Sequence, residues 1–270
     1  MGDKISVNYV LLKLNEMFKV IDISSPLVIG EDIDQAKAIQ SEKRFDRVPI
    51  RTDGKILSYY DSNSNSEMKI ESNDLISESA GIFETLSYLS KRDFYFVLNG
   101  NDLTDIVHYS DLNNPLALLG IYAQIAYCEN AIRDFARSKN RNDNTESNIK
   151  EFLNDINYQI KGNKIKIRRA IDHFGDKKKS ETETDLFDEL YFDDELILFR
   201  ELLNLELNHN KETRFKNSIN LDDSKIEHYT DLRNAIMHSK PRIIEKSCDV
   251  KKWLNFLQSC QNIIKGCFYD

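Results

Sequence analysis

The chain has 270 residues, of which 40% are hydrophobic, and its formal net charge is −8. This length suits two modest domains, since a single domain usually holds roughly 100–200 residues. The acidic balance argues against a protein that coats duplex nucleic acid, because such binding needs an excess of Lys and Arg. No apolar run approaches the ~18 residues of a membrane span. The four cysteines form no Cys-x-x-Cys pair, so we expect a reduced, cytoplasmic protein without a structural metal site.

The first part of the chain repeats one order of elements. After a predicted helix over 5–21, each copy has an extended segment, a helix, a strand, a turn and a second strand. The elements expected in the first copy are a helix over 32–45 and strands over 46–50 and 55–60. Those expected in the second copy are a helix within 75–93 and strands over 94–98 and 103–109. The polar tract over 61–74 is rich in turn formers and predicts a loop. This pattern indicates an internal duplication of about 50 residues, with repeats at about 15–62 and 70–113.

The second part, residues 114–270, predicts helices only. They are expected over 116–138, 149–160, 163–174, 184–208, 222–239 and 249–266. The first of them carries a stripe of apolar residues at helical spacing: Leu118, Ile121, Ile125, Cys128 and Ile132. The sequence therefore predicts an α+β protein, in which an α/β module over 1–113 precedes an all-α bundle.

Two matching stretches stand out in the first part, DRVPI with TDGKILSYYD and FYFVL with NGNDLTDIVHYSDLN. They resemble a pair of CBS domains, the modules that together form a Bateman unit. In that family the second strand of each repeat ends in a hydrophobic residue, Thr or Ser, two variable residues and Asp. The hydroxyl and the carboxylate face a cleft between the repeats, and the Asp binds a ribose diol. The resemblance covers the two repeats and implies that this part senses an adenine nucleotide.

Residues of this chain can be matched to that CBS pattern. Ser58 and Asp61 match it in full in the first copy, and Asp111 matches it in the second, where His108 replaces the hydroxyl residue. A carboxylate can accept hydrogen bonds from two vicinal hydroxyls, and Arg47, at the start of a strand that contains Pro, is placed to reach a phosphate. The resemblance therefore implies a nucleotide site of these five residues, with ATP, ADP, AMP or a related adenylate as the regulatory ligand.

A late predicted helix contains the segment DLRNAIMHSKP. This segment resembles the active motif of HEPN domains, compact helical bundles of prokaryotic toxins, defence nucleases and their non-catalytic relatives. Nuclease members carry Arg, four to six residues and His, usually with a polar residue directly after the Arg. Arg233, Asn234 and His238 fit that pattern. A second pair, Arg168 and His173, lacks the polar residue, and the alternative for it is an ordinary basic helix face.

The HEPN resemblance implies metal-independent cleavage of RNA, with no cofactor for catalysis. The imidazole would take the proton of the 2′-hydroxyl or protonate the leaving 5′-oxygen, and the guanidinium would stabilise charge on the phosphorane. Asn234 would orient the phosphate or the imidazole, and Glu129, on the first helix of the bundle, is a candidate supporting residue. Side chains five residues apart on a helix point ~140° from each other. Members of the family combine two copies to complete the site, so we expect a homodimer.

Two functions remain open from the sequence. The first is a dimeric ribonuclease of the toxin or defence type, which an adenine nucleotide regulates. The second is a non-catalytic regulator, in which the helical part only dimerises or binds a partner. The presence of both Asn234 and His238 favours the ribonuclease, whereas the net acidity and the altered second CBS motif weigh against it.

Overall fold

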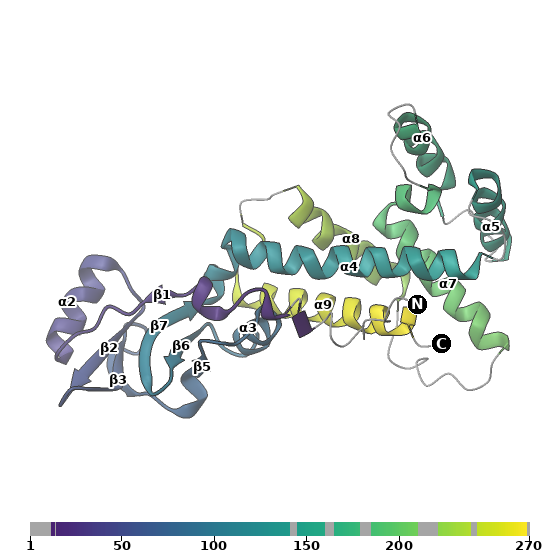
Figure 1. Cartoon of the computed structure of the whole chain (residues 1–270). Helices are drawn as coiled ribbons and strands as arrows, with labels where there is room; N and C mark the ends of the chain where they lie inside the picture. The colour runs from purple at the N-terminus through teal and green to yellow at the C-terminus, as the bar shows by residue number, and fades with distance from the viewer. Residues whose placement is uncertain are drawn as a thin grey trace. The chain divides into compact units, whose positions relative to one another are not determined.

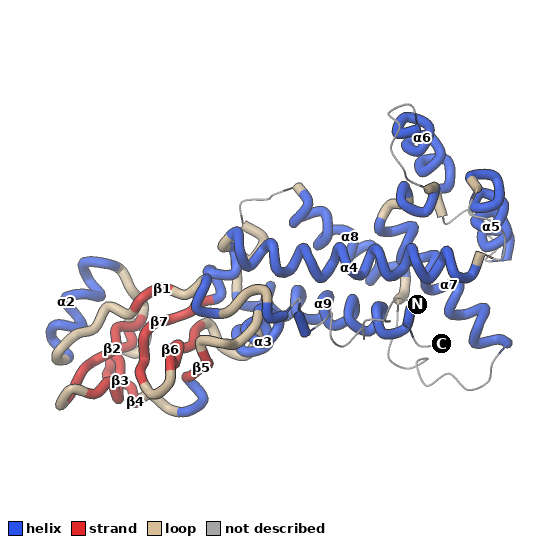
Figure 2. The backbone as a smooth tube through the Cα atoms, in the orientation of Figure 1, coloured by secondary structure: helices blue, strands red, loops and turns tan. Residues whose placement is uncertain are grey.

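The computed structural model describes residues 12–13, 15–140, 145–159, 165–178, 185–209, 221–238 and 242–268 (Figure 1). These residues form two compact units. The sheet unit comprises the described residues of 12–120 and 241–254, and the helical unit comprises those of 121–240 and 255–268. Helices α4 (Pro115–Lys139) and α9 (Ser247–Phe268) contribute residues to both. The predicted α+β class is confirmed, because the described strands all belong to the sheet unit and helices dominate the rest (Figure 2).

The described strands of the sheet unit form two sheets. One sheet is antiparallel and has the order β2 (Arg47–Thr52), β3 (Lys55–Asp61), β4 (Ser66–Lys69). The other has the order β1 (Ser25–Pro26), β7 (Asp102–His108), β6 (Phe94–Asn99), β5 (Leu75–Ser77). In this second sheet β5 and β6 are parallel and the other pairs are antiparallel. The unit also contains α2 (Ile33–Lys43), α3 (Ile82–Leu89) and three 3-10 turns, η1 (Val20–Asp22), η2 (Ser72–Asp74) and η3 (Tyr109–Asn113).

The sheet unit contains one order of elements twice. In the first copy Gly30 bridges Ile50 in parallel, α2 follows in the chain, and β2 and β3 form a hairpin. In the second copy β5 pairs in parallel with β6, α3 follows β5, and β6 and β7 form a hairpin. Asp32 caps α2 by accepting a 2.7 Å hydrogen bond from a backbone N–H of its first turn, which agrees with the acidic start of this helix. Asp53 and Gly54 turn the first hairpin with positive φ at both residues, which a type I′ turn requires.

One expectation for this unit is wrong. The polar tract over 61–74 predicts a loop, but it contains β4 and η2. β4 pairs with the outer edge of β3, and most of its side chains are exposed. An edge strand of this kind needs no alternating apolar pattern, so pattern reasoning cannot find it. Most of the helix expected over 5–21 lies outside the described residues, within which 12–13 and 15–16 are helical.

An aromatic cluster joins the two copies inside the sheet unit. Tyr59 of β3 packs edge-on against Phe94 and Phe96 of β6, with ring centroids 5.8 and 5.3 Å apart. All three side chains are buried. Because edge-on aromatic pairs add about 0.5–1.5 kcal/mol to the effect of burial alone, this cluster holds the end of β3 firmly against the start of β6.

The helical unit contains α5 (Glu146–Gln159), α6 (Ile167–Lys178), α7 (Phe192–His209) and α8 (Asp223–Met237), with parts of α4 and α9. The apolar stripe predicted on α4 is buried at four of its five positions: Ile121, Ile125, Cys128 and Ile132. The single helix expected over 184–208 is instead a 3-10 turn, η4 (Leu186–Glu189), followed by α7. Leu190 is extended and interrupts the helix, and Asp185 caps η4. None of the described helices has the length and apolarity needed to cross a membrane.

Candidate functional site

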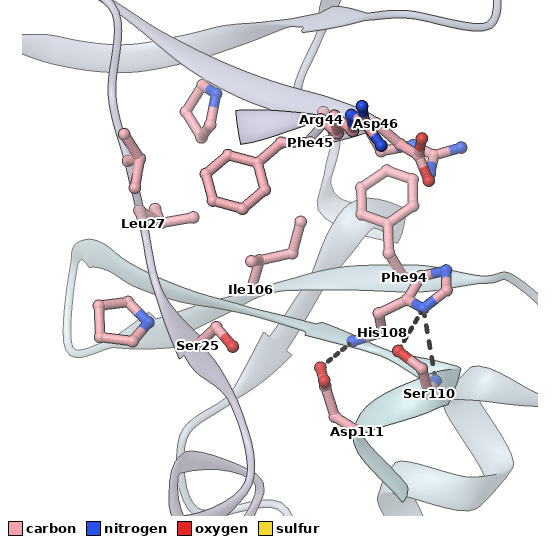
Figure 3. Close-up of a pocket in the computed structure, with 14 residues that line it drawn as sticks. Ser25, Leu27, Arg44, Phe45, Asp46, Phe94, Ile106, His108, Ser110 and Asp111 are labelled. Carbon is pink, nitrogen blue, oxygen red and sulfur yellow. Dashed lines mark hydrogen bonds between the residues drawn. The ribbon is translucent and has the colours of Figure 1, made fainter. Parts of the chain in front are cut away.

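The sheet unit contains a cavity of about 310 Å³, which we call the first cavity (Figure 3). Its lining comes from residues 25–28, from the connection between α2 and β2, and from the end of β7 with η3. Leu27, Phe45 and Ile106 give it an apolar side, and charged side chains such as Arg44, Asp46 and Asp111 also line it (Figure 3). Small-molecule sites have volumes of about 300–1,000 Å³ and combine apolar walls with a few polar groups. The first cavity therefore has the size and lining of a small-ligand site.

His108 and Asp111 both line the first cavity. The Asp111 carboxylate accepts a 2.7 Å hydrogen bond from the His108 N–H, and His108 Nδ1 lies 2.9 Å from the Ser110 hydroxyl (Figure 3). Burial raises the pKa of Asp111, and the hydrogen bond from the His108 backbone opposes that rise. Burial also lowers the pKa of His108. A carboxylate has about four acceptor positions, so Asp111 can accept further hydrogen bonds from a ligand.

The sheet unit contains a second cavity of about 650 Å³. Its lining comes from the end of β3, from residues 68–74 and from residues 91–94. Arg47 and Phe94 line both cavities. Asp61 lines only the second cavity, where its Oδ2 lies 3.8 Å from Arg47 Nε. Ser58, which the motif assigns to the same site as Asp61, lines neither cavity, and its hydroxyl donates a 2.5 Å hydrogen bond to the Glu67 carboxylate across the β3–β4 pair.

The strand registers correct the match between the two copies. β2 pairs Arg47 with Asp61, and β6 pairs Phe94 with His108, so Asp61 occupies the place of His108 in the other copy. By the same register the residue in the first copy equivalent to Asp111 is residue 64, a serine that lines neither cavity. The expectation of equivalent aspartates at the ends of the two copies is therefore wrong. Matching the motif Ser-x-x-Asp by residue type aligns Asp61 with Asp111. Counting residues from the first strand of each hairpin, which follows Asp46 or Asp93, aligns Asp61 with His108, as the registers do.

The helical unit holds a chain of four ionisable side chains, Glu129, Arg133, Glu195 and Arg233, which we call the charged cluster. Arg233 Nε of α8 donates a 2.8 Å hydrogen bond to Glu129 Oε1 of α4. Arg133 lies one turn further along α4, with its Nη2 3.8 Å from Glu129 Oε2. Its Nε donates a 2.6 Å hydrogen bond to Glu195 of α7. The structure thus brings together two of the predicted residues, Arg233 and Glu129.

The charged cluster becomes more accessible toward Arg233. The Glu195 side chain is fully buried, whereas that of Arg233 is 23% exposed. Burial raises the pKa of Glu195 to about 8, and the charge of Arg133 opposes that rise. Sequence reasoning missed Arg133 and Glu195. The spacing of four residues between Glu129 and Arg133 is a signal that places them on one helix face, but no local pattern links Glu195 to them.

Asn234 and His238 lie near the end of α8. Asn234 Oδ1 is 3.4 Å from Arg233 Nη1. His238 is the C-terminal cap of α8 and is exposed, and its ring forms no hydrogen bond with the described residues. No hydrogen bond joins Arg233 to His238 within the described part of one chain. The alternative pair lies on α6, where Arg168 is exposed and the His173 ring hydrogen-bonds the Tyr191 hydroxyl at 2.8 Å.

A scan against protein-family models and a search of the curated proteins found no match for this chain. The described residues also contain no group of three or more His, Cys, Asp or Glu side chains placed to hold a metal ion. The likeness to CBS and HEPN domains thus rests on the sequence motifs, to which the two units add the distances, burial and charge of the motif residues.

Proposed function

We propose that the protein is a metal-independent endoribonuclease, in which the helical unit cleaves RNA and an adenine nucleotide bound to the sheet unit regulates cleavage. The observation that carries this proposal is the contrast within α8. Arg233 is fixed by the 2.8 Å hydrogen bond to Glu129, whereas the His238 ring at the end of the same helix is exposed. A fixed cation and an accessible imidazole are the two groups that phosphoryl transfer needs, one for charge stabilisation and the other for proton movement.

The proposed reaction begins with attack of an RNA 2′-hydroxyl oxygen on the adjacent phosphorus. The O2′–P bond forms and the P–O5′ bond breaks, which gives a 2′,3′-cyclic phosphate and a 5′-hydroxyl. One imidazole accepts the 2′-hydroxyl proton, and a protonated imidazole returns a proton to the 5′-oxygen. Arg233 donates hydrogen bonds to the phosphoryl oxygens as negative charge builds on them, because the planar guanidinium matches phosphate geometry.

A homodimer accounts for the separation of Arg233 from His238. Within one chain the two side chains are not joined by a hydrogen bond in the described residues, and they come from positions ~140° apart around a helix. Two copies related by a two-fold axis would place Arg233 of one chain near His238 of the other. Closed two-fold pairing is the commonest form of oligomer, so we assign the active site to two chains.

The first cavity is the proposed regulatory site for an adenine nucleotide. Its apolar side would hold the adenine, and Asp111 would accept hydrogen bonds from the ribose hydroxyls. Arg44 and Arg47, which line the charged side, would bind phosphate. Each part of a nucleotide thus has a chemical counterpart in the lining of the cavity.

A second function, that of a non-catalytic regulator, is favoured by the charged cluster itself. Arg233 is engaged by Glu129, which also lies near Arg133. A cation so held can serve the packing of α8 against α4 without any reaction. In that case the helical unit would only pair chains or bind a partner, and substitutions at His238 would have no biochemical effect.

Incubation of the purified full-length protein with end-labelled RNA in EDTA, with and without AMP, ADP or ATP, tests the proposal. We expect cleavage with 2′,3′-cyclic phosphate ends, a change in rate with nucleotide, and loss of cleavage in His238→Ala and Arg233→Lys. His173→Ala and Arg168→Ala are the matched controls, because they alter the second Arg–His pair. Absence of cleavage in every condition would favour the non-catalytic regulator, and loss in the control variants alone would identify α6 as the active helix.

A further inference from the structure

Arg47 is shared by two cavities and has an unused hydrogen-bond donor. Its side chain is 13% exposed, and its guanidinium carbon lies 4.1 Å from the centre of the Phe94 ring. Arg47 Nε is buried and donates no hydrogen bond to the described residues. A buried donor without an acceptor is rare in folded proteins, and it indicates a group that is completed by a ligand or by a rearrangement.

Asp61 is the anion nearest to this donor, but it is poorly placed to accept from it. The distance from Asp61 Oδ2 to Arg47 Nε is 3.8 Å, which allows electrostatic attraction and no hydrogen bond. The other oxygen, Oδ1, already accepts a 2.8 Å hydrogen bond from the Asn63 N–H. Asp61 also lines only the second cavity, and the register makes it equivalent to His108 rather than to Asp111.

We propose that Asp61 is a counter-ion that competes with a ligand phosphate for Arg47, and is not itself a contact of the nucleotide. This inference rests on the proposed nucleotide site in the first cavity. In the free protein Arg47 is balanced by Asp61 on the side of the second cavity. When a phosphate occupies the first cavity, Arg47 donates to it and the attraction to Asp61 is weakened. Asp61 therefore limits the affinity of the site for anions.

Removal of the Asp61 carboxylate should have opposite effects on nucleotide affinity under this proposal and under the CBS resemblance. If Asp61 bound the ribose, its removal would weaken nucleotide binding. If it competes for Arg47, its removal strengthens binding, because the guanidinium no longer has a carboxylate partner. The two side chains are largely buried and 3.8 Å apart, so their electrostatic attraction is only weakly screened, and we expect its loss to raise the affinity about 10-fold, which corresponds to about 1.4 kcal/mol.

The experiment is a calorimetric titration of AMP into the full-length protein, with ATP as a second titrant. The central variant is Asp61→Asn, which keeps an acceptor for the Asn63 N–H and removes the charge. Glu31→Gln is the matched control, because Glu31 forms a 3.0 Å ion pair with Arg51 on the same strand as Arg47 and lines neither cavity. This control measures the effect of removing one negative charge from a neighbouring ion pair.

We expect Asp61→Asn to bind AMP about 10-fold more tightly than the wild type, and Glu31→Gln to bind it with unchanged affinity. In an Arg47→Gln background the effect of Asp61→Asn should vanish, because the residue for which Asp61 competes is gone. If Arg47→Gln does not fold, Arg47→Lys serves, and the gain from Asp61→Asn should then be smaller than in the wild type.

Three results would decide against this inference or its premise. Weaker AMP binding by Asp61→Asn would make Asp61 a ligand contact and would overturn the proposal. An equal gain in Glu31→Gln would reduce it to a general effect of charge. Absence of binding of both AMP and ATP in every variant, including the wild type, would instead refute the proposed nucleotide site itself.

Discussion

Glu195 should make the stability of the helical unit fall as the pH rises. Its pKa is raised from 4.5 to about 8 because the side chain is fully buried. In the folded protein Glu195 keeps its proton up to about pH 8, whereas in the unfolded chain it loses the proton near the ordinary value. Unfolding between about pH 5 and 8 therefore releases a proton, and rising pH favours the unfolded state. The slope is about 1.4 kcal/mol per pH unit for one such group.

The perturbation that isolates this effect is Glu195→Gln, which keeps the size of the side chain and an acceptor for Arg133 Nε. We expect the free energy of unfolding of the wild type to fall relative to the variant by about 1.4 kcal/mol for each unit between about pH 5 and 8. Urea unfolding followed by far-UV circular dichroism at several pH values measures the difference. Glu227→Gln, at an exposed position on α8, is the control and should follow the wild type.

Equal pH slopes in the wild type and Glu195→Gln would refute this reasoning. They would mean that Glu195 ionises within the folded protein at ordinary pH and that Arg133 compensates fully for its burial. The charged or titratable groups that face Glu195 are Arg133 and Glu129 of α4, Cys128 of the same helix and Arg233 of α8. Of these, only Arg133 donates a hydrogen bond to it among the described residues.

Stability in the sheet unit and thiol reactivity offer two further tests. Asn113 receives hydrogen bonds from the Ile243 and Ile244 N–H groups and donates one to the Ile244 carbonyl, so Asn113→Ala should lower the free energy of unfolding by roughly 1–3 kcal/mol in urea titrations. A loss within error of zero would contradict it. Iodoacetamide should modify exposed Cys248 before Cys128, because burial hides the Cys128 thiol and raises its pKa. Peptide mass spectrometry checks the order, and early modification of Cys128 would contradict the packing.

The sequence predicted the elements of the sheet unit where local chemistry determines them. Asp32 caps α2 within the predicted helix over 32–45, and Asp53 and Gly54 form the turn between the predicted strands over 46–50 and 55–60. The sequence could not predict β4, because the side chains of this strand are mostly exposed and it forms by hydrogen bonding to the edge of β3. It also failed at the break at Leu190, because the flanking residues 186–189 and 192–209 are both helical in pattern. In both cases contacts with the rest of the fold, rather than local sequence preference, determined the secondary structure.

The sequence predicted those candidate site residues that residue type and local position identify, and it missed those that depend on the tertiary fold. Glu129 and Arg233 could be named from their types and their helices, and the structure brings them together. Arg47 and Asp111 could be named from strand ends, and both line the first cavity. The role of Asp61 could not be predicted, because it depends on how the two copies are aligned. One alignment makes Asp61 equivalent to Asp111, and an alignment shifted by three positions makes it equivalent to His108. Only the hydrogen-bond register of the hairpins distinguishes these alternatives.

The charged cluster connects the pH dependence to the proposed function. Below about pH 8 Glu195 is neutral, so two guanidinium groups share the one carboxylate of Glu129 and the cluster has an excess positive charge. Buried ion pairs contribute little net stability compared with apolar packing, and an excess positive charge here would serve the phosphate binding that we propose beside Arg233. Ionisation of Glu195 above about pH 8 removes the excess charge. RNA cleavage should decline in both proteins as the protonated imidazole is lost, and above that pH the wild type should decline more steeply than Glu195→Gln. A decline of the same size in both proteins would show that Glu195 does not govern the charge available to the phosphate.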